Sequence, residues 1–146
     1  MAFVLILFAI LAGMALPTQF NVNAQLKTIV GSPIIASGIS FIVGAISLLV
    51  ISLFSSGIHI KKDWLNAPWW MWTGGILGAF YVLATTILMP RIGAAATVGY
   101  VLVGQIIISI LIDHLGLIGA TTQTLSFPRI LGAALVVIGV ILVQKF

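Results

Sequence analysis

The sequence predicts an all-α membrane protein, a bundle of five transmembrane helices, and its composition and the length of its apolar runs both lead to that class. Of 146 residues, 62% are hydrophobic and only 5% are charged, with a mean hydropathy of +1.32, whereas soluble domains carry roughly 25% charged residues. The apolar residues also occur in long uninterrupted runs, which is typical of membrane helices. We therefore expect a multi-pass protein of the cell (inner, cytoplasmic) membrane.

Five apolar stretches are long enough to cross a bilayer core of roughly 30 Å as helices. They are Ala2–Leu26, Gly31–Ser55, Trp69–Met89, Gly93–His114 and Pro128–Gln144. We expect them to form a single domain over residues 1–146. The expected connections alternate between short links, at residues 27–30 and 90–92, and longer ones, at residues 57–68 and 115–127.

The first stretch needs its polar second half in order to span. A helix that stopped at Leu16, before Pro17, would be only about 22 Å long, so part of the amide-rich segment that follows must lie at membrane depth. A signal peptide is the alternative for this end of the chain, but there is no Lys or Arg before Lys27 to form its basic region. We expect a first helix that begins at the start of the chain and continues through Pro17.

The basic residues give no preferred orientation, although Lys and Arg near span ends normally favour the cytoplasm. The face with the short links would carry Lys27, Arg91 and Lys145. The opposite face would carry Lys61, Lys62 and Arg129. A chain with such a tie can insert both ways, and two oppositely inserted copies would form an antiparallel pair. The alternative is that local charge position or the free N-terminal amine fixes one orientation.

Four amides in the first span fall on two sides of its helix. At 100° per residue, Gln19 and Asn23 lie within about 40° of each other, as do Asn21 and Gln25, while the two pairs lie on nearly opposite sides. They cannot all face one polar cavity. We expect Gln19 and Asn23 to face the interior and to hydrogen-bond a substrate, because Gln25 should lie at the boundary beside Lys27.

The third and fourth spans carry further polar groups. Tyr81, near the middle of the third span, is a candidate to line a cavity, whereas Thr85 and Thr86 can bond their own backbone one turn back. In the fourth span, Gln105 and Asp113 follow one side of the helix together with Ser109 and Thr97. A polar row in a bilayer faces a partner helix or a cavity, so Gln105 is a second cavity candidate.

Asp113 is the only acidic residue in any expected span. Ionisable groups inside membranes are costly and often functional, so Asp113 is a candidate charge or proton site near one mouth of the pathway. The alternative is a carboxylate in the headgroup region, solvated or paired with His114.

Small residues line the expected contact faces, as is typical of membrane helix packing. Ser32, Ala36, Ser40 and Gly44 recur every four residues in the second span, and Gly74 and Gly78 form a GxxxG motif in the third. Three tryptophans at 69, 70 and 72 open the third span. They are typical of a membrane-interface belt, with a binding wall for cations or flat rings as the alternative.

Several of these segments resemble a known family over nearly the full length of the chain. The matching stretches are QFNVNAQL at 19–26, PWWMWTGGILGAFYV at 68–82, MPRIGAAATV at 89–98, GQIIISILIDHLGLIG at 104–119 and RILGAALVVIGVILV at 129–143. In these stretches the chain resembles the YdcZ-like five-helix proteins of the drug/metabolite transporter superfamily, which are related to the EamA-like transporters.

The resemblance implies a five-helix unit equivalent to half of a ten-helix inverted-repeat transporter, so that two units of opposite orientation make the carrier. It implies no particular substrate. Four-helix multidrug exporters of the same superfamily use a glutamate in their first helix to exchange protons for cations, and this chain carries only amides there. That departure argues against proton-coupled cation export.

We therefore expect a transporter subunit that moves a small polar or amphipathic solute by alternating access, as an antiparallel homodimer or with a paralogous subunit. The alternative is a non-transporting accessory or structural subunit of a larger membrane complex. With no cysteine, one acid at a helix end and two separated histidines, the sequence offers no nucleophile–base pair. We expect no enzyme activity, no metal, no cofactor and no nucleic-acid partner.

Overall fold

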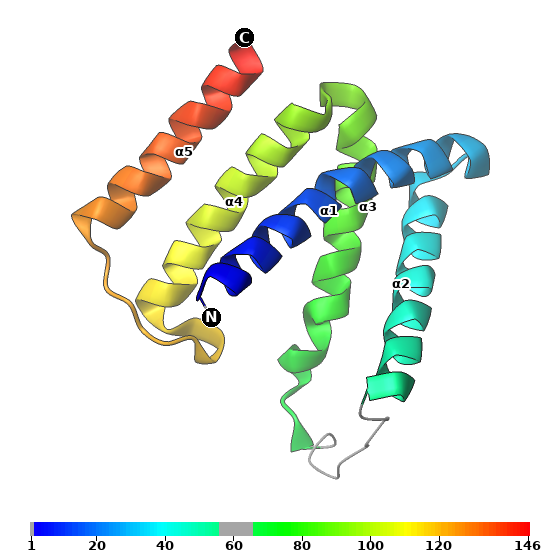
Figure 1. The fold of residues 1–146 in the computed structure, drawn as a ribbon, viewed down its shortest axis with the longest axis horizontal. Helices are drawn as coiled ribbons and strands as arrows, with labels where there is room; N and C mark the ends of the chain where they lie inside the picture. The colour runs from blue at the N-terminus through cyan, green and yellow to red at the C-terminus, as the bar shows by residue number, and fades with distance from the viewer. Residues whose placement is uncertain (1, 56–65) are drawn as a thin grey trace. The chain divides into compact units, whose positions relative to one another are not determined.

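The structure is a computed structural model that describes residues 2–55 and 66–146, and it contains all five expected spans as helices (Figure 1). They are α1 (Ala2–Val30), α2 (Pro33–Ser55), α3 (Gly74–Ile92), α4 (Ala94–Leu115) and α5 (Phe127–Lys145), with single 3-10 turns η2 (Trp69–Thr73) and η3 (Leu117–Gly119). The described residues contain no strand. Because all five are long and apolar enough to cross a membrane, with η2 extending α3, the all-α five-helix class is confirmed.

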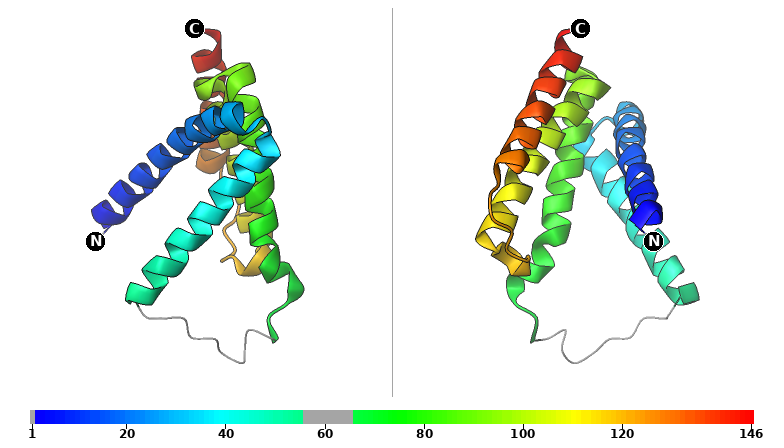
Figure 2. Two further views of the ribbon diagram at one scale, coloured as in Figure 1. Left: turned by 90° about the vertical axis from the view of Figure 1, so that its right-hand side faces the viewer. Right: turned by 60° about the vertical axis from the view of Figure 1, so that its left-hand side comes forward.

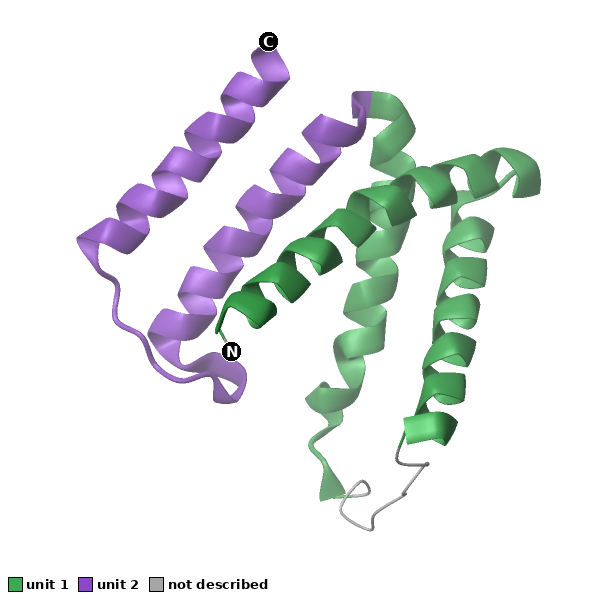
Figure 3. Cartoon of the chain, viewed as in Figure 1, with its two compact units in different colours: residues 1–91 green, residues 92–146 purple. Residues whose placement is uncertain are grey.

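The chain divides into two compact units, residues 1–91 and residues 92–146 (Figure 3). Unit 1 holds α1, α2 and nearly all of α3. Unit 2 holds α4, η3 and α5.

In unit 1, α1 and α2 pack together beside their link and diverge away from it (Figure 2). Ala36 and Ser37 of α2 are buried, as are Phe20 and Asn23 of α1. Small residues let two helix backbones approach closely in a membrane, which explains why burial is concentrated at this part of the α2 small-residue stripe. Helices α2 and α3 also meet, since a Cβ placed on Gly78 would lie 3.1 Å from Cζ of Phe41.

In unit 2, α4 and α5 run side by side in opposite directions (Figures 1 and 2). The closest approach that a glycine allows there is at Gly99, where an added Cβ would lie 2.6 Å from Cγ1 of Val140. No side chain larger than hydrogen fits at that position without a shift of α5 or of the Val140 rotamer.

Two helices run further than the sequence indicates. Helix α1 continues to Val30 and α3 continues through Pro90 to Ile92, so the expected short links at 27–30 and 90–92 are helical. The turns fall instead on glycines, at Gly31 with φ +74° and Gly93 with φ +83°. Glycine adopts this left-handed backbone at little cost, so these two positions suit the turns between the helices.

The charged residues that the structure describes and the three tryptophans of η2 lie at or near helix ends. Lys27, Arg91 and Lys145 lie in the last turns of α1, α3 and α5, and Arg129 lies near the start of α5. Lys61 and Lys62 are outside the described residues. The three tryptophans of η2 are all exposed, which suits the interface belt expected of them.

Candidate functional site

The side of α1 that faces the interior of unit 1 carries Gln19, Phe20 and Asn23. Phe20 and Asn23 each expose only 2% of their surface, and Gln19 is half-buried. Asn21 and Gln25 are exposed on the other side of the helix. The structure therefore brings the pair expected to face inward to the packed side, and their role in binding stays a prediction.

Asn21 is satisfied within its own helix, beside the proline. Its Nδ2 donates to the carbonyl of Pro17 at 3.1 Å, and Thr18 Oγ1 donates to the carbonyl of Met14 at 3.1 Å. The carbonyl that Pro17 deprives of its helical donor is that of Gly13, four residues earlier, and these two bonds go to other carbonyls. Asn21 thus has its donor occupied within its own helix.

Gln19 connects α1 to α2. Its Nε2 donates to Oγ of Ser40 at 3.4 Å. Because α1 and α2 are antiparallel, one turn closer to their link the same register brings Asn23 to the level of Ala36, which is fully buried. Asn23 consequently lies at the level of a small residue of α2, near the link between the two helices.

Tyr81 connects α3 to the same side of α1. The Phe20 and Tyr81 rings meet edge to face, with centroids 5.7 Å apart and an interplanar angle of 67°, a favourable arrangement of two aromatic rings. Three of the five residues that the sequence singles out, Gln19, Asn23 and Tyr81, are therefore gathered in unit 1. We call them, with Phe20 and Ser40, the amide cluster.

Asn23 is the unusual member of the amide cluster. Its Nδ2 atom is buried and has no hydrogen-bond partner among the described residues. A buried donor without an acceptor costs about 1–3 kcal/mol, and such groups are rare in native structures. An acceptor supplied from outside the chain, by a solute or a water, would remove that cost.

The threonines of the spans behave differently from Asn23. Thr86 Oγ1 donates to the carbonyl of Val82 at 2.7 Å, and Thr85 Oγ1 lies 3.0 Å from the carbonyls of Tyr81 and Val82. Thr97 Oγ1 donates to the carbonyl of Gly93 at 2.8 Å. The expectation that Thr85 or Thr86 bonds its own backbone is confirmed. These hydroxyls are buried without needing a ligand.

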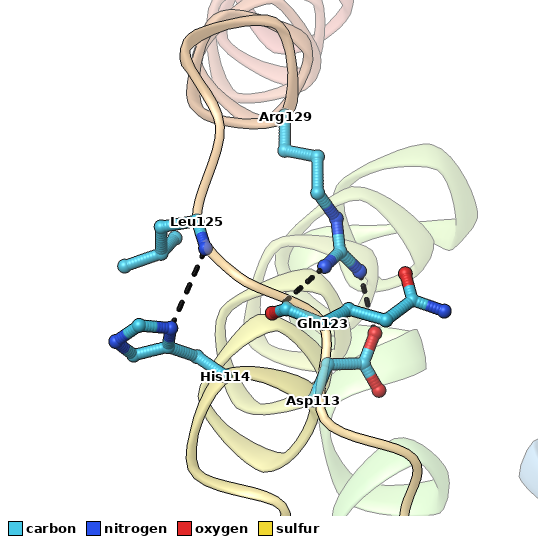
Figure 4. A network of polar contacts seen from close by, with 5 residues as sticks. All are labelled: Asp113, His114, Gln123, Leu125 and Arg129. Atoms are coloured by element: carbon cyan, nitrogen blue, oxygen red, sulfur yellow. Dashed lines mark hydrogen bonds and ion pairs between the residues drawn. The ribbon is translucent and has the colours of Figure 1, made fainter.

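Asp113 belongs to a polar network in unit 2 that joins the end of α4 to the start of α5 (Figure 4). Its carboxylate pairs with the Arg129 guanidinium at 2.5 Å, and both side chains are about a third exposed. The backbone of the connecting segment takes part, because Gln123 N donates to the carbonyl of Asp113 at 2.8 Å and Arg129 Nη1 donates to the carbonyl of Gln123 at 3.5 Å. Asp113 is therefore paired with Arg129 and not with His114.

His114 also contacts the segment that connects η3 to α5. Its Nδ1 accepts a hydrogen bond from the backbone N–H of Leu125 at 3.4 Å. Asp113 and His114 together fix the chain between η3 and α5 (Figure 4).

Gln105, the remaining candidate, is exposed on α4 in unit 2.

Sequence reasoning missed three residues at these sites. Ser40 counted only as a small packing residue, Phe20 as an apolar one and Arg129 only as a topology signal. For Arg129 a signal was present, since antiparallel helices bring the end of one span close to the start of the next.

Each unit also has a hollow. One of about 320 Å³ in unit 1 is lined by Ile34, Ser37, Gly38, Phe41, Ala79 and Leu83. Its one hydroxyl, on Ser37, donates to the carbonyl of Pro33, so this hollow offers mainly apolar contact. One of about 500 Å³ in unit 2 lies between the start of α4 and the end of α5, and at its edge Tyr100 Oη donates to Gln144 Oε1.

Across residues 2–55 and 66–146, no three His, Asp or Glu side chains lie close enough together to share a metal ion.

Comparison with known proteins supports the family resemblance. The family model described as "Putative inner membrane exporter, YdcZ" matches residues 4–142. The chain is 28% identical over 139 residues to the inner membrane protein YdcZ of Escherichia coli (strain K12), covering 94% of this chain and 93% of that protein. No solved structure matches the chain. With a family match over almost its whole length and five membrane helices, the chain belongs to the YdcZ family of multi-pass inner-membrane proteins.

Proposed function

We propose that the chain is one subunit of a membrane carrier that moves a small polar or amphipathic solute by alternating access, as an antiparallel dimer. The family's description as an exporter supports transport, and outward movement is the direction it suggests. The observation that carries the proposal is the buried, unpartnered Nδ2 of Asn23 in the membrane-spanning helix α1.

A carrier must bind its solute reversibly, and an unpaired donor in a low-dielectric interior suits that need. A hydrogen bond there is electrostatically stronger than in water, and the solute replaces no existing protein bond when it binds. Asn23 would bind a solute that carries a carbonyl, carboxylate or hydroxyl oxygen, because such an oxygen accepts a hydrogen bond from Nδ2. Gln19 and Tyr81 would contact the same solute, because they share the packed side of α1.

The neighbouring surfaces support an amphipathic solute. Phe20 lies three residues before Asn23 on the same side of α1, and its ring contacts that of Tyr81. The unit 1 hollow adds apolar surface between α2 and α3. Among the described residues of unit 1 there is no carboxylate, so this site would recognise its solute by hydrogen bonds and shape.

Alternating access follows from the inverted-repeat architecture that the resemblance implies. In such carriers the binding site lies near the bilayer midplane between two oppositely oriented halves, which rock around it. Two copies of this chain in opposite orientations would supply the halves, with one amide cluster each. Asp113 stays a proposed charge site near one mouth, where a solute would have to compete with Arg129.

The test is transport by the purified protein in sealed vesicles, with a panel of neutral amides, carboxylates, zwitterions and organic cations as solutes. We expect uptake of solutes that carry a hydrogen-bond acceptor and an apolar part, with little transport of cations that lack an acceptor. Asp113→Asn in the same assay tests the charge site. If a folded preparation moves no member of the panel, the accessory-subunit alternative is favoured.

A further inference from the structure

Helix α4 carries two exposed polar side chains that the amide cluster does not use, Gln105 and Ser109. Neither has a hydrogen-bond partner within residues 2–55 and 66–146. Gln105 lies at the midpoint of the 22-residue helix α4, which places its amide near the centre of the bilayer. Lipid cannot satisfy an amide at that depth, so such groups in membranes face another polar surface.

Ser109 differs from most of the hydroxyls described in these helices. Thr18, Ser37, Ser47, Thr85, Thr86 and Thr97 each donate to a carbonyl one turn back. Ser109 makes no such bond, although its own helix offers one. Its hydroxyl therefore remains free to pair with Gln105 of another chain.

We infer that this strip of α4, formed by Leu102, Gln105 and Ser109, is the contact between two antiparallel copies of the chain. Gln105 of each copy donates to Ser109 of the other. The inference rests on the proposed antiparallel carrier and names the surface on which its two copies meet.

The spacing of the pair makes the strip self-complementary in that orientation. When two copies of one helix are related by a two-fold axis in the membrane plane, each residue faces the one equally far beyond the axis. An axis at the level of residue 107 brings Gln105 opposite Ser109 and Ser109 opposite Gln105, which gives two identical hydrogen bonds. That level is about 4 Å from the midpoint of α4, so the axis lies close to the bilayer midplane, as opposite insertion requires.

A parallel pair would instead place Gln105 against Gln105 and Ser109 against Ser109. Because glutamine and serine each donate and accept, such pairs can also hydrogen-bond, and the opposite orientation is taken from the proposed antiparallel carrier. In that orientation Gln105 has a role between copies in place of the cavity contact suggested by sequence.

The chain has no cysteine, so no native cysteine has to be removed before cysteines are introduced for crosslinking. Two differently tagged copies, one with Gln105→Cys and one with Ser109→Cys, are expressed together and oxidised in native membranes. We expect a disulfide-linked dimer that carries both tags. Ile107→Cys is the matched control, because its side chain lies at the same depth about 200° around the helix. With that variant we expect no crosslinked dimer.

A second measurement removes the hydrogen bonds without introducing a crosslink. Gln105→Leu combined with Ser109→Ala should lower the association constant of the dimer by about tenfold, since interhelical hydrogen bonds in membranes are individually modest. Ile107→Leu should leave self-association unchanged. Dimer fraction by single-molecule photobleaching in vesicles gives both values.

The outcomes separate this inference from the proposed function. Crosslinks of 105 to 105 and of 109 to 109 that exceed 105 to 109 would show a parallel contact and overturn the inference. A dimer without any crosslink at these positions would place the interface elsewhere, or show the strip covered by lipid or by unit 1, and would also overturn it. A 105–109 crosslink in a protein that transports no solute would support the contact and count against the carrier.

Discussion

At the scale of single residues, the informative contrast is between two asparagines of α1 that are two positions apart. Asn21 is exposed and donates to the Pro17 carbonyl, whereas Asn23 is buried with an unpaired Nδ2. They have the same chemistry in the same helix and differ in what their amides can still bind. Helical geometry predicts that they lie on different sides, but only the structure shows which amide has its donor already occupied.

Replacing Asn23 by leucine should abolish or strongly reduce transport while leaving the helix intact. Leucine is a better helix former than asparagine and removes the orphaned donor, so we expect stability to stay the same or to increase by about 1 kcal/mol. The solute affinity in vesicles and the thermal unfolding of the detergent-solubilised protein are the two measurements.

Asn21→Leu is the matched control for this prediction. It should keep transport and lose at most about 1 kcal/mol of stability through its backbone bond. Loss of transport in Asn21→Leu together with retention in Asn23→Leu would place the binding face on the opposite side of α1.

At the scale of helices, the sequence predicts the five elements because their runs of apolar residues are long and carry few charges. It does not predict where α1 and α3 end, since Pro90 suggests an earlier stop than the one set by Gly93.

The Asp113–Arg129 pair was also missed, because the two residues are 16 positions apart in sequence and come together only through the antiparallel packing of α4 and α5. As a pair that is a third exposed, it contributes at most about 1 kcal/mol.

The contact of α4 with α5 gives a prediction about packing. Gly99→Ala places a methyl group against Val140, a β-branched residue with little rotamer freedom in a helix. We expect destabilisation of about 1–3 kcal/mol, the usual cost of overpacking, measured by thermal unfolding in mixed micelles.

Gly104→Ala is the control in the same helix, because nothing lies within 4 Å of the added Cβ. It should be neutral or slightly stabilising through better helix propensity. Adding Val140→Ala to Gly99→Ala should recover part of the loss. Equal effects of Gly99→Ala and Gly104→Ala would mean that α4 and α5 do not pack at Gly99.

At the scale of the whole molecule, the outstanding property is the balance of basic residues, three on each expected face. Of these, Lys27, Arg91 and Lys145 lie in the last turns of their helices and Arg129 lies near the start of α5. The balance is a property of the sequence, and the orientation of each copy is set when it is inserted into the membrane.

Because the basic residues are balanced between the two expected faces, removing one of them should change the orientation of the chain in the membrane. Lys27→Gln leaves two basic residues against three and should move the majority of copies toward one orientation, and Lys62→Gln should move them the other way. Reporters that are active on one side only, fused after Phe146, measure the ratio. Equal reporter ratios in both variants and in the unaltered chain would show that something other than basic residues sets the orientation.

The limited burial within one copy has a practical consequence for handling the protein. Only Phe20, Ala36, Val82 and Met89 form a buried apolar core among the described residues. Each membrane helix satisfies its backbone hydrogen bonds by itself, so a detergent-dispersed single copy would show full helical circular dichroism. Helical content is therefore no quality criterion for a preparation of this protein, and samples should be judged by their assembly state before any activity is interpreted.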